Sequence, residues 1–86
     1  MYYERMKKKL EAAFSPSFLE IRDDSASHAG HSGARPEGET HFHVTIHAKA
    51  FDGLSRVAAQ RAVYAALKAE IDEHVHALGL TVKGVR

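Results

Sequence analysis

The chain has no cysteine, and this absence excludes several kinds of chemistry. Without thiols there can be no disulfide, so the folded state must be stabilised by packing alone. Cysteine nucleophiles, zinc fingers and an iron–sulfur site ligated only by the chain's own thiolates are excluded as well. Any metal that this protein ligates must therefore be held by nitrogen or oxygen donors.

Long hydrophobic runs and a surplus of one charge are also missing. No apolar stretch approaches the roughly 18–20 residues that a membrane-spanning helix needs. Residues 1–14, which include Glu4 and Glu11, have no long apolar core and do not resemble a secretory or mitochondrial targeting segment. The 12 Lys and Arg against 11 Asp and Glu leave a net charge of +1, too balanced to indicate nucleic-acid binding by itself. We therefore expect a soluble cytoplasmic protein with no membrane contact.

Histidine, in contrast, is abundant and grouped: seven of the 86 residues are His. They lie in a polar, glycine-rich stretch (His28, His31), in HFHVTIH (His41, His43, His47) and in HVHALGL (His74, His76). Neutral imidazole is the commonest metal ligand among side chains and also titrates nearest neutral pH. Clustered His without Cys therefore predicts nitrogen ligation, if the chain binds a metal at all.

The first half of the chain predicts one helix, one strand and a long loop. Residues 2–14 place Tyr3, Met6 and Leu10 on one side of a helix that Pro16 ends, and residues 18–22 alternate as a strand does. Residues 23–40 hold three of the six glycines and no large apolar side chain, which predicts a loop. Because loops longer than roughly 12–15 residues are usually functional or disordered, and this one carries two His, we expect a functional loop.

The second half predicts a strand, a helix and a last strand. Residues 41–49 alternate between an apolar face and a polar face that carries the His side chains. After a turn at 51–53, Ser55 is expected to cap a helix that ends near residue 72, and residues 77–83 alternate again. The expected apolar faces are Phe42, Val44, Ile46 and Ala48 in the strand, and Val57, Tyr64, Leu67 and Ile71 in the helix.

This order of elements, α-β-β-α-β, predicts an α+β two-layer sandwich. The first two strands can pair antiparallel across the long loop. The second and third are joined through a helix, so they should run parallel with a right-handed crossover. A three-stranded mixed sheet with both helices on one face would then bury the even-numbered apolar residues of 42–48. We expect residues 1–86 to form this single domain.

Several motifs together resemble the BolA family. They are GETHFHV entering the second strand, FDGLS leaving it, RAVYAAL in the helix and VHAL after it. The resemblance covers the chain from about Met6 to Val82 and implies a fold similar to a type II KH domain. It also implies partnership with a monothiol glutaredoxin, with a [2Fe–2S] cluster shared between the two proteins and glutathione.

The resemblance also implies which residues ligate that cluster. One is the His of VHAL, which is His76 here. The second is a His or Cys in the loop between the first two strands, which implies His28 here, with His31 as the alternative. The chain departs from the family in its helix, which reads Ala59-Gln60-Arg61 where Arg-His-Arg is common, and this weakens any role that needs a basic helix face.

The alternatives to a shared cluster use other residues. A DNA-binding regulator would rely on the basic residues Lys7, Lys8, Lys9, Arg56 and Arg61. Zinc or copper could instead be buffered by His41, His43 and His47, although these fit a half-exposed polar sheet face better. No Ser, His and acid arrangement is evident, so we expect no enzyme activity, and we expect the free protein to be a monomer.

Overall fold

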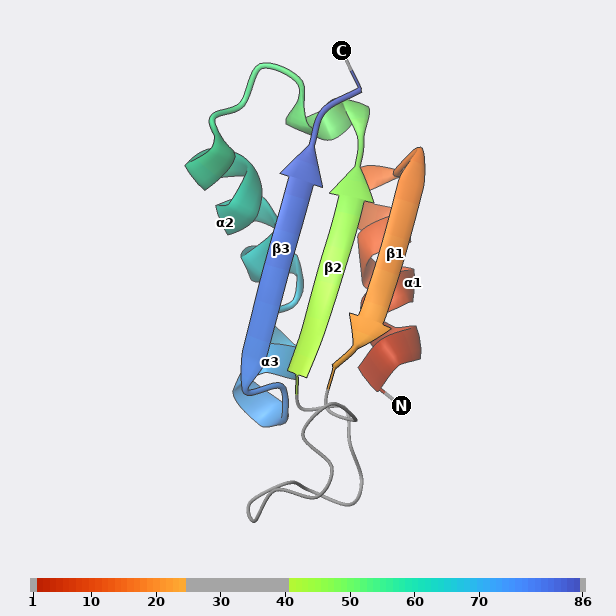
Figure 1. The fold of residues 1–86 in the computed structure, drawn as a ribbon, viewed down its shortest axis with the longest axis vertical. Coiled ribbons are helices and arrows are strands. Elements are labelled where there is room, and N and C mark those ends of the chain that lie inside the picture. Colours follow the sequence, from red (N-terminus) through yellow and green to blue (C-terminus); the bar gives the residue numbers. More distant parts are fainter. Residues whose placement is uncertain (1, 25–40, 86) are drawn as a thin grey trace.

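The computed structural model describes residues 2–24 and 41–85 (Figure 1). No helix in these two ranges is both long and apolar enough to cross a membrane. The elements, in chain order, are α1 (Tyr2–Phe14), β1 (Phe18–Asp23), β2 (His41–His47), a 3-10 turn η2 (Lys49–Phe51), α2 (Arg56–Ala66), α3 (Lys68–Glu73) and β3 (Ala77–Lys83).

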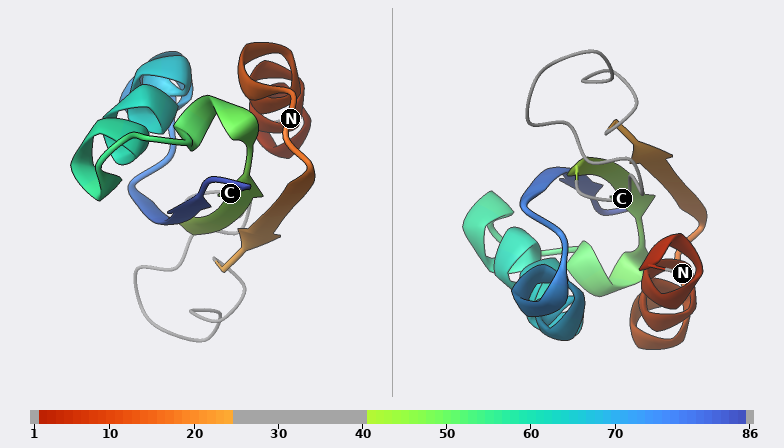
Figure 2. Two further views of the ribbon diagram at one scale, coloured as in Figure 1. Left: turned by 90° about the horizontal axis from the view of Figure 1, so that it is seen from above. Right: turned by 90° about the horizontal axis from the view of Figure 1, so that it is seen from below.

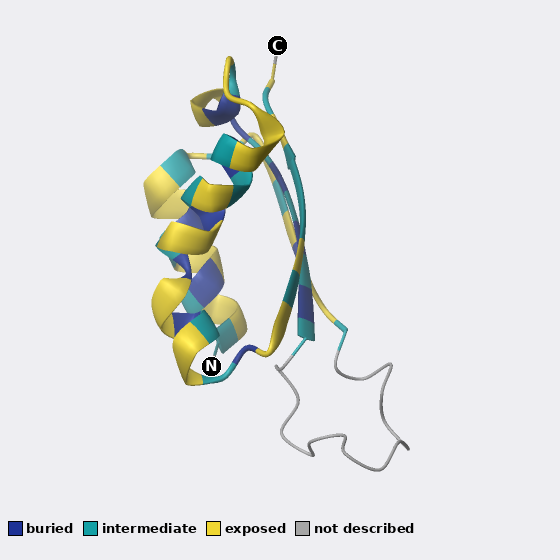
Figure 3. Ribbon diagram, turned by 90° about the vertical axis from the view of Figure 1, so that its left-hand side faces the viewer, coloured by how far each residue is buried: buried dark blue, intermediate teal, exposed yellow. Residues whose placement is uncertain are grey.

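The three strands form one mixed sheet in the order β1-β2-β3. β1 runs antiparallel to β2, with Phe18 opposite His47, and β2 runs parallel to β3, with His41 opposite Ala77. All the described helices lie against one face of the sheet, as the side view in Figure 3 and the end views in Figure 2 show. The predicted α+β two-layer sandwich is confirmed.

The central strand supplies the middle of the core. Its burial alternates residue by residue, and Val44 and Ile46 are completely buried. The helix α1 covers this face with Met6 and Leu10, which are one turn apart and also inaccessible to solvent. The predicted inward face of 42–48 is therefore confirmed, because a period of two on a central strand leaves one face against the helix layer.

The second helical region differs from the prediction. It divides at Leu67, which is buried but departs from helical geometry (φ −107°, ψ 14°) between α2 and α3. The buried stripe of α2 is Ala59 and Val63, whereas Val57 and Tyr64 are 54% and 42% exposed. The predicted inward face is therefore wrong at Val57 and Tyr64 but confirmed at Leu67, which is fully buried, and at Ile71, which packs against the core.

The segment after β2 also differs from the prediction. The strand ends at His47 rather than Lys49, and Phe51, expected in a turn, is buried against Phe14 with ring centroids 4.9 Å apart. The predicted helix cap is confirmed, because the Ser55 hydroxyl accepts the backbone N–H of Ala58 at 3.1 Å.

Candidate metal-ligand site

His76 lies in the short connection between α3 and β3. The carbonyl of Glu70 accepts the N–H groups of both His74 and Val75, each at 3.0 Å, and this closes α3. Val75 is 3% exposed and anchors the connection in the core, whereas His76 is exposed. The buried valine thus holds the backbone and leaves the His76 imidazole accessible at the rim of the sandwich.

The neighbouring His74 is held against α1. Its ring stacks on Tyr2, with centroids 4.8 Å apart and planes inclined by 6°. The guanidinium of Arg5 lies 4.8 Å from the centre of the same Tyr2 ring. The rings of His74 and His76 are 6.5 Å apart. Of these two histidines, His76 is therefore the one whose ring faces solvent.

The sheet brings both ends of the 25–40 segment close to this connection. Asp24 donates its N–H to the carbonyl of His41 at 2.7 Å, and His41 pairs with Ala77, the residue after His76. The chain therefore leaves β1 and enters β2 at the end of the sheet where β3 begins (Figure 1). The two predicted loop ligands, His28 and His31, lie outside the described residues.

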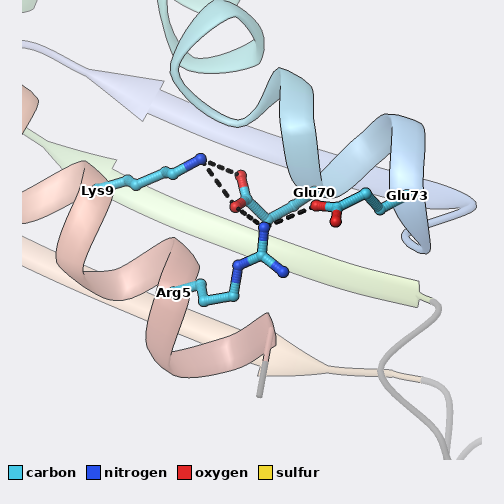
Figure 4. A network of polar contacts seen from close by, with 4 residues as sticks. All are labelled: Arg5, Lys9, Glu70 and Glu73. Atoms are coloured by element: carbon cyan, nitrogen blue, oxygen red, sulfur yellow. Dashed lines mark hydrogen bonds and ion pairs between the residues drawn. The ribbon is translucent and has the colours of Figure 1, made fainter.

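A buried carboxylate lies beside the same connection, and the sequence prediction did not include it. Glu70 of α3 is fully buried, and its oxygens contact Lys9 at 2.8 and 2.9 Å and Arg5 at 2.9 Å (Figure 4). Arg5 also bonds to Glu73 at 2.7 Å. These four residues join the first turns of α1 to the last turn of the helical layer, directly before His74.

Burial by itself raises the pKa of the Glu70 carboxyl, since it penalises the charged form. The hydrogen bond from Lys9, the backbone hydrogen bond at Glu70 and the positive charges of Lys9 and Arg5 outweigh that penalty, so the pKa lies below its ordinary value. Glu70 is therefore an anion inside the fold.

The burial of Glu70 could have been predicted from its spacing in the sequence. It follows Val63 by seven residues and Leu67 by three, which places it on the buried stripe of the helical region.

The His residues of β2 are arranged as a polar sheet face. His43 bonds through Nε2 to the Thr81 hydroxyl at 3.0 Å, and the ring of His47 lies 5.2 Å from that of Phe18. Within residues 2–24 and 41–85, no three His, Asp or Glu side chains gather in a way that could hold a metal ion. The described part of the chain therefore supplies single donors rather than a complete site.

The basic residues of the DNA-binding alternative do not form one positive surface. Lys9 is ion-paired with the buried Glu70, so its charge is already balanced within the fold. Lys7 and Lys8 are exposed but share a shallow depression with Glu4 and Glu11. The remaining two, Arg56 and Arg61, are exposed on α2.

Comparison with curated proteins gives close relatives. The sequence model of the family described as BolA-like protein matches residues 10–85. The chain is 43% identical over 81 residues to "Protein BOLA1, chloroplastic" of Arabidopsis thaliana and 41% identical over 78 residues to human BolA-like protein 1. These matches cover 92% and 91% of this chain but 51% and 54% of the relatives, so the chain spans about half their length. A Sinorhizobium relative, described as an uncharacterized protein in the cobS 5' region, is 45% identical over 78 residues, with 90% of this chain and 84% of that protein covered.

Solved structures agree with this grouping. BolA1 from Arabidopsis thaliana superposes with a TM-score of 0.85 at 36% identity, covering 99% of this chain and 93% of that chain. The solution structure of mouse BolA1 gives a TM-score of 0.80 at 33% identity, covering 98% and 65% of the two chains. The motifs read from the sequence, the mixed sheet with its helices on one face and these matches agree, and the chain belongs to the BolA family.

Proposed function

We propose that this chain is a non-catalytic adaptor that binds a monothiol glutaredoxin and co-ligates a [2Fe–2S] cluster shared with that partner and glutathione. The observation that supports this most is the exposed imidazole of His76 at the rim where the 25–40 segment leaves and rejoins the sheet. Imidazole nitrogen is a ligand well suited to iron.

The donor set also suits a cluster that is completed by another protein. The chain has no thiol, and its described residues gather no group of three ligands. In a shared cluster, a glutaredoxin cysteine and glutathione would supply the thiolates that this chain lacks. Two imidazoles in place of two thiolates would raise the reduction potential of the cluster, in the direction seen in Rieske centres.

The second ligand in this proposal is His28, with His31 as the alternative. His28 follows Asp24 by four residues and His31 follows it by seven, so an extended chain reaches at most roughly 14 and 25 Å from Asp24. Asp24 is hydrogen-bonded to His41, which pairs with the residue next to His76. The length of the chain therefore allows either loop histidine to share a metal with His76.

The proposal is tested by titrating a cluster-loaded monothiol glutaredoxin with this protein and recording visible circular dichroism. We expect a new spectrum that saturates at one equivalent and is lost in His76→Ala. The matched control is His47→Ala, at the other end of β2, which should behave as the original chain does. Testing His28→Ala and His31→Ala separately identifies the loop ligand. An unchanged spectrum on mixing, or full activity of His76→Ala in this assay, would contradict the proposal.

A further inference from the structure

The outer edge of the sheet at β3 has unpaired backbone groups. Ala48 donates its N–H to the carbonyl of Lys83, which faces β2, whereas the carbonyl of Leu78 faces outward and accepts the Tyr64 hydroxyl at 3.0 Å. Alternate residues of an edge strand face its partner and the outside. The N–H and C=O groups of Leu80 and Val82 therefore point outward, and no hydrogen bond from the described residues satisfies them.

A groove runs along these unpaired groups. Its volume is about 340 Å³, and it is lined by Arg56 and Gln60 of α2 and by residues 80–83 of β3. In Figure 1, α2 lies beside the free edge of β3, so the helix forms the second wall. The hydrogen bond from Tyr64 to Leu78 occupies the strand edge before the groove begins. The open length is thus about three or four residues.

The groove is positively charged. Arg56 and Lys83 line it, both are exposed, and neither has a carboxylate partner within residues 2–24 and 41–85. The first turn of α2 contains no acidic residue to offset the positive end of the helix dipole. An occupant should therefore carry a negative charge at this end of the groove.

We propose that this groove binds a short, extended, acidic peptide segment of a partner protein by strand addition to β3. The segment would bond to the outward backbone groups of Leu80 and Val82 and bring its carboxylates to the end of the groove that Arg56 and Lys83 line. Strand addition draws affinity from backbone hydrogen bonds and specificity from nearby side chains, and a groove between an edge strand and a helix provides both.

This surface is separate from the proposed cluster site. His76 precedes β3 and Lys83 ends it, so the two ends are about 23 Å apart at 3.3 Å per residue. A protein could occupy the groove while iron is held at the other end of the sheet. The inference does not depend on the proposed function. It assigns this small domain a second surface at which a partner protein binds.

The test uses the ¹⁵N-labelled chain and a five-residue peptide, acetyl-Thr-Val-Asp-Val-Asp with a free C-terminal carboxylate. We expect the amide protons of Leu80 and Val82 to shift downfield and to exchange more slowly with solvent, because they gain hydrogen bonds. The amides of Ala77 and Gly79, which already face β2, should change little. An amidated peptide with Asn in place of Asp should bind more weakly.

Charge variants then locate the carboxylate. Arg56→Gln and Lys83→Gln should each weaken peptide binding about two- to fivefold, as expected for one partly exposed ion pair. Arg61→Gln on the same helix is the matched control and should leave the dissociation constant unchanged. The proposal is overturned if the neutral peptide binds equally well, if shifts lie outside the groove, or if no peptide binding is seen at millimolar concentration. Tighter binding of a short single-stranded oligonucleotide at the same amides would also overturn it in favour of a phosphate ligand.

Discussion

Replacing Lys9 by Met removes one of the two cations that neutralise the buried Glu70. The Lys9 ammonium lies 2.9 Å from Oε1 and 2.8 Å from Oε2 of that carboxylate, whose side chain has no exposed surface. Arg5 remains within 2.9 Å of Oε2. Methionine keeps much of the aliphatic stem, so the substitution mainly removes charge and hydrogen bonding.

The expected loss of stability depends on how deeply each charged group is buried, and Glu70 is buried more deeply than Lys9. Breaking a fully buried ion pair costs about 3–5 kcal/mol, because the remaining charge is left uncompensated. Here the Lys9 side chain is 40% exposed and Arg5 still faces the carboxylate, so water and the second cation reduce the loss. We expect the free energy of unfolding at pH 7 to fall by about 2–3 kcal/mol, which lowers the Tm by roughly 10–20 °C in a domain of this size.

The cost should depend on pH in a defined direction. The folded pKa of Glu70 lies below the ordinary value of 4.5, so its ionisation stabilises the fold above that pH and the contribution is lost as pH falls through the folded pKa. Without Lys9, burial is less strongly opposed and the folded pKa rises. As pH falls, the carboxyl is then protonated earlier in the variant than in the original chain, so the difference in stability between the two proteins should shrink.

Urea unfolding followed by far-ultraviolet circular dichroism between pH 3.5 and 7.5 measures both effects. Lys8→Met is the matched control, because Lys8 is an exposed neighbour on α1 that makes no ion pair within the described residues, and it should change stability by less than about 0.5 kcal/mol. If Lys9→Met costs no more than Lys8→Met at pH 7, or if its cost stays constant down to pH 3.5, the assignment of Glu70 as a buried anion held by Lys9 is wrong.

Substitutions at three further positions test how the sandwich is held together. Tyr64→Phe removes the hydroxyl that binds the Leu78 carbonyl, so stability should fall by about 0.5–1.5 kcal/mol in urea unfolding; no change would show that water replaces the bond equally well. Ser55→Ala removes the cap of α2 and should cost about 1 kcal/mol, whereas Ser55→Gly should cost only a few tenths. Gly79→Ala would bring a methyl group within 2.7 Å of Nδ1 of His43, so we expect a loss of about 1–2 kcal/mol and a shifted His43 ring signal in NMR; a variant as stable as the original chain would refute the close approach.

Local patterns in the sequence determined much of the architecture. The alternation in 41–47 predicted the inward side of the central strand, because a pleated strand has only two faces and one carried the apolar residues. The order of elements predicted antiparallel and parallel pairing, since a helical crossover joins strands that run the same way. The same motifs indicated the family, and with it the proposal that His76 ligates iron.

Only the tertiary structure decided which residues meet across long separations. The helix was expected to bury Val57 and Tyr64, but Ala59 and Val63 are the buried residues of α2, because the way the whole helix packs on the sheet sets which of its sides faces inward. The spacing of Glu70 from Val63 and Leu67 indicates its buried side, but not its partner: only the fold brings Lys9, 61 positions earlier in the chain, to within hydrogen-bonding distance. The free edge of β3 beside α2 likewise exists only once the sheet has formed. Sequence periodicity specifies the face of each element, whereas the partner of a buried charge depends on how whole elements pack in three dimensions.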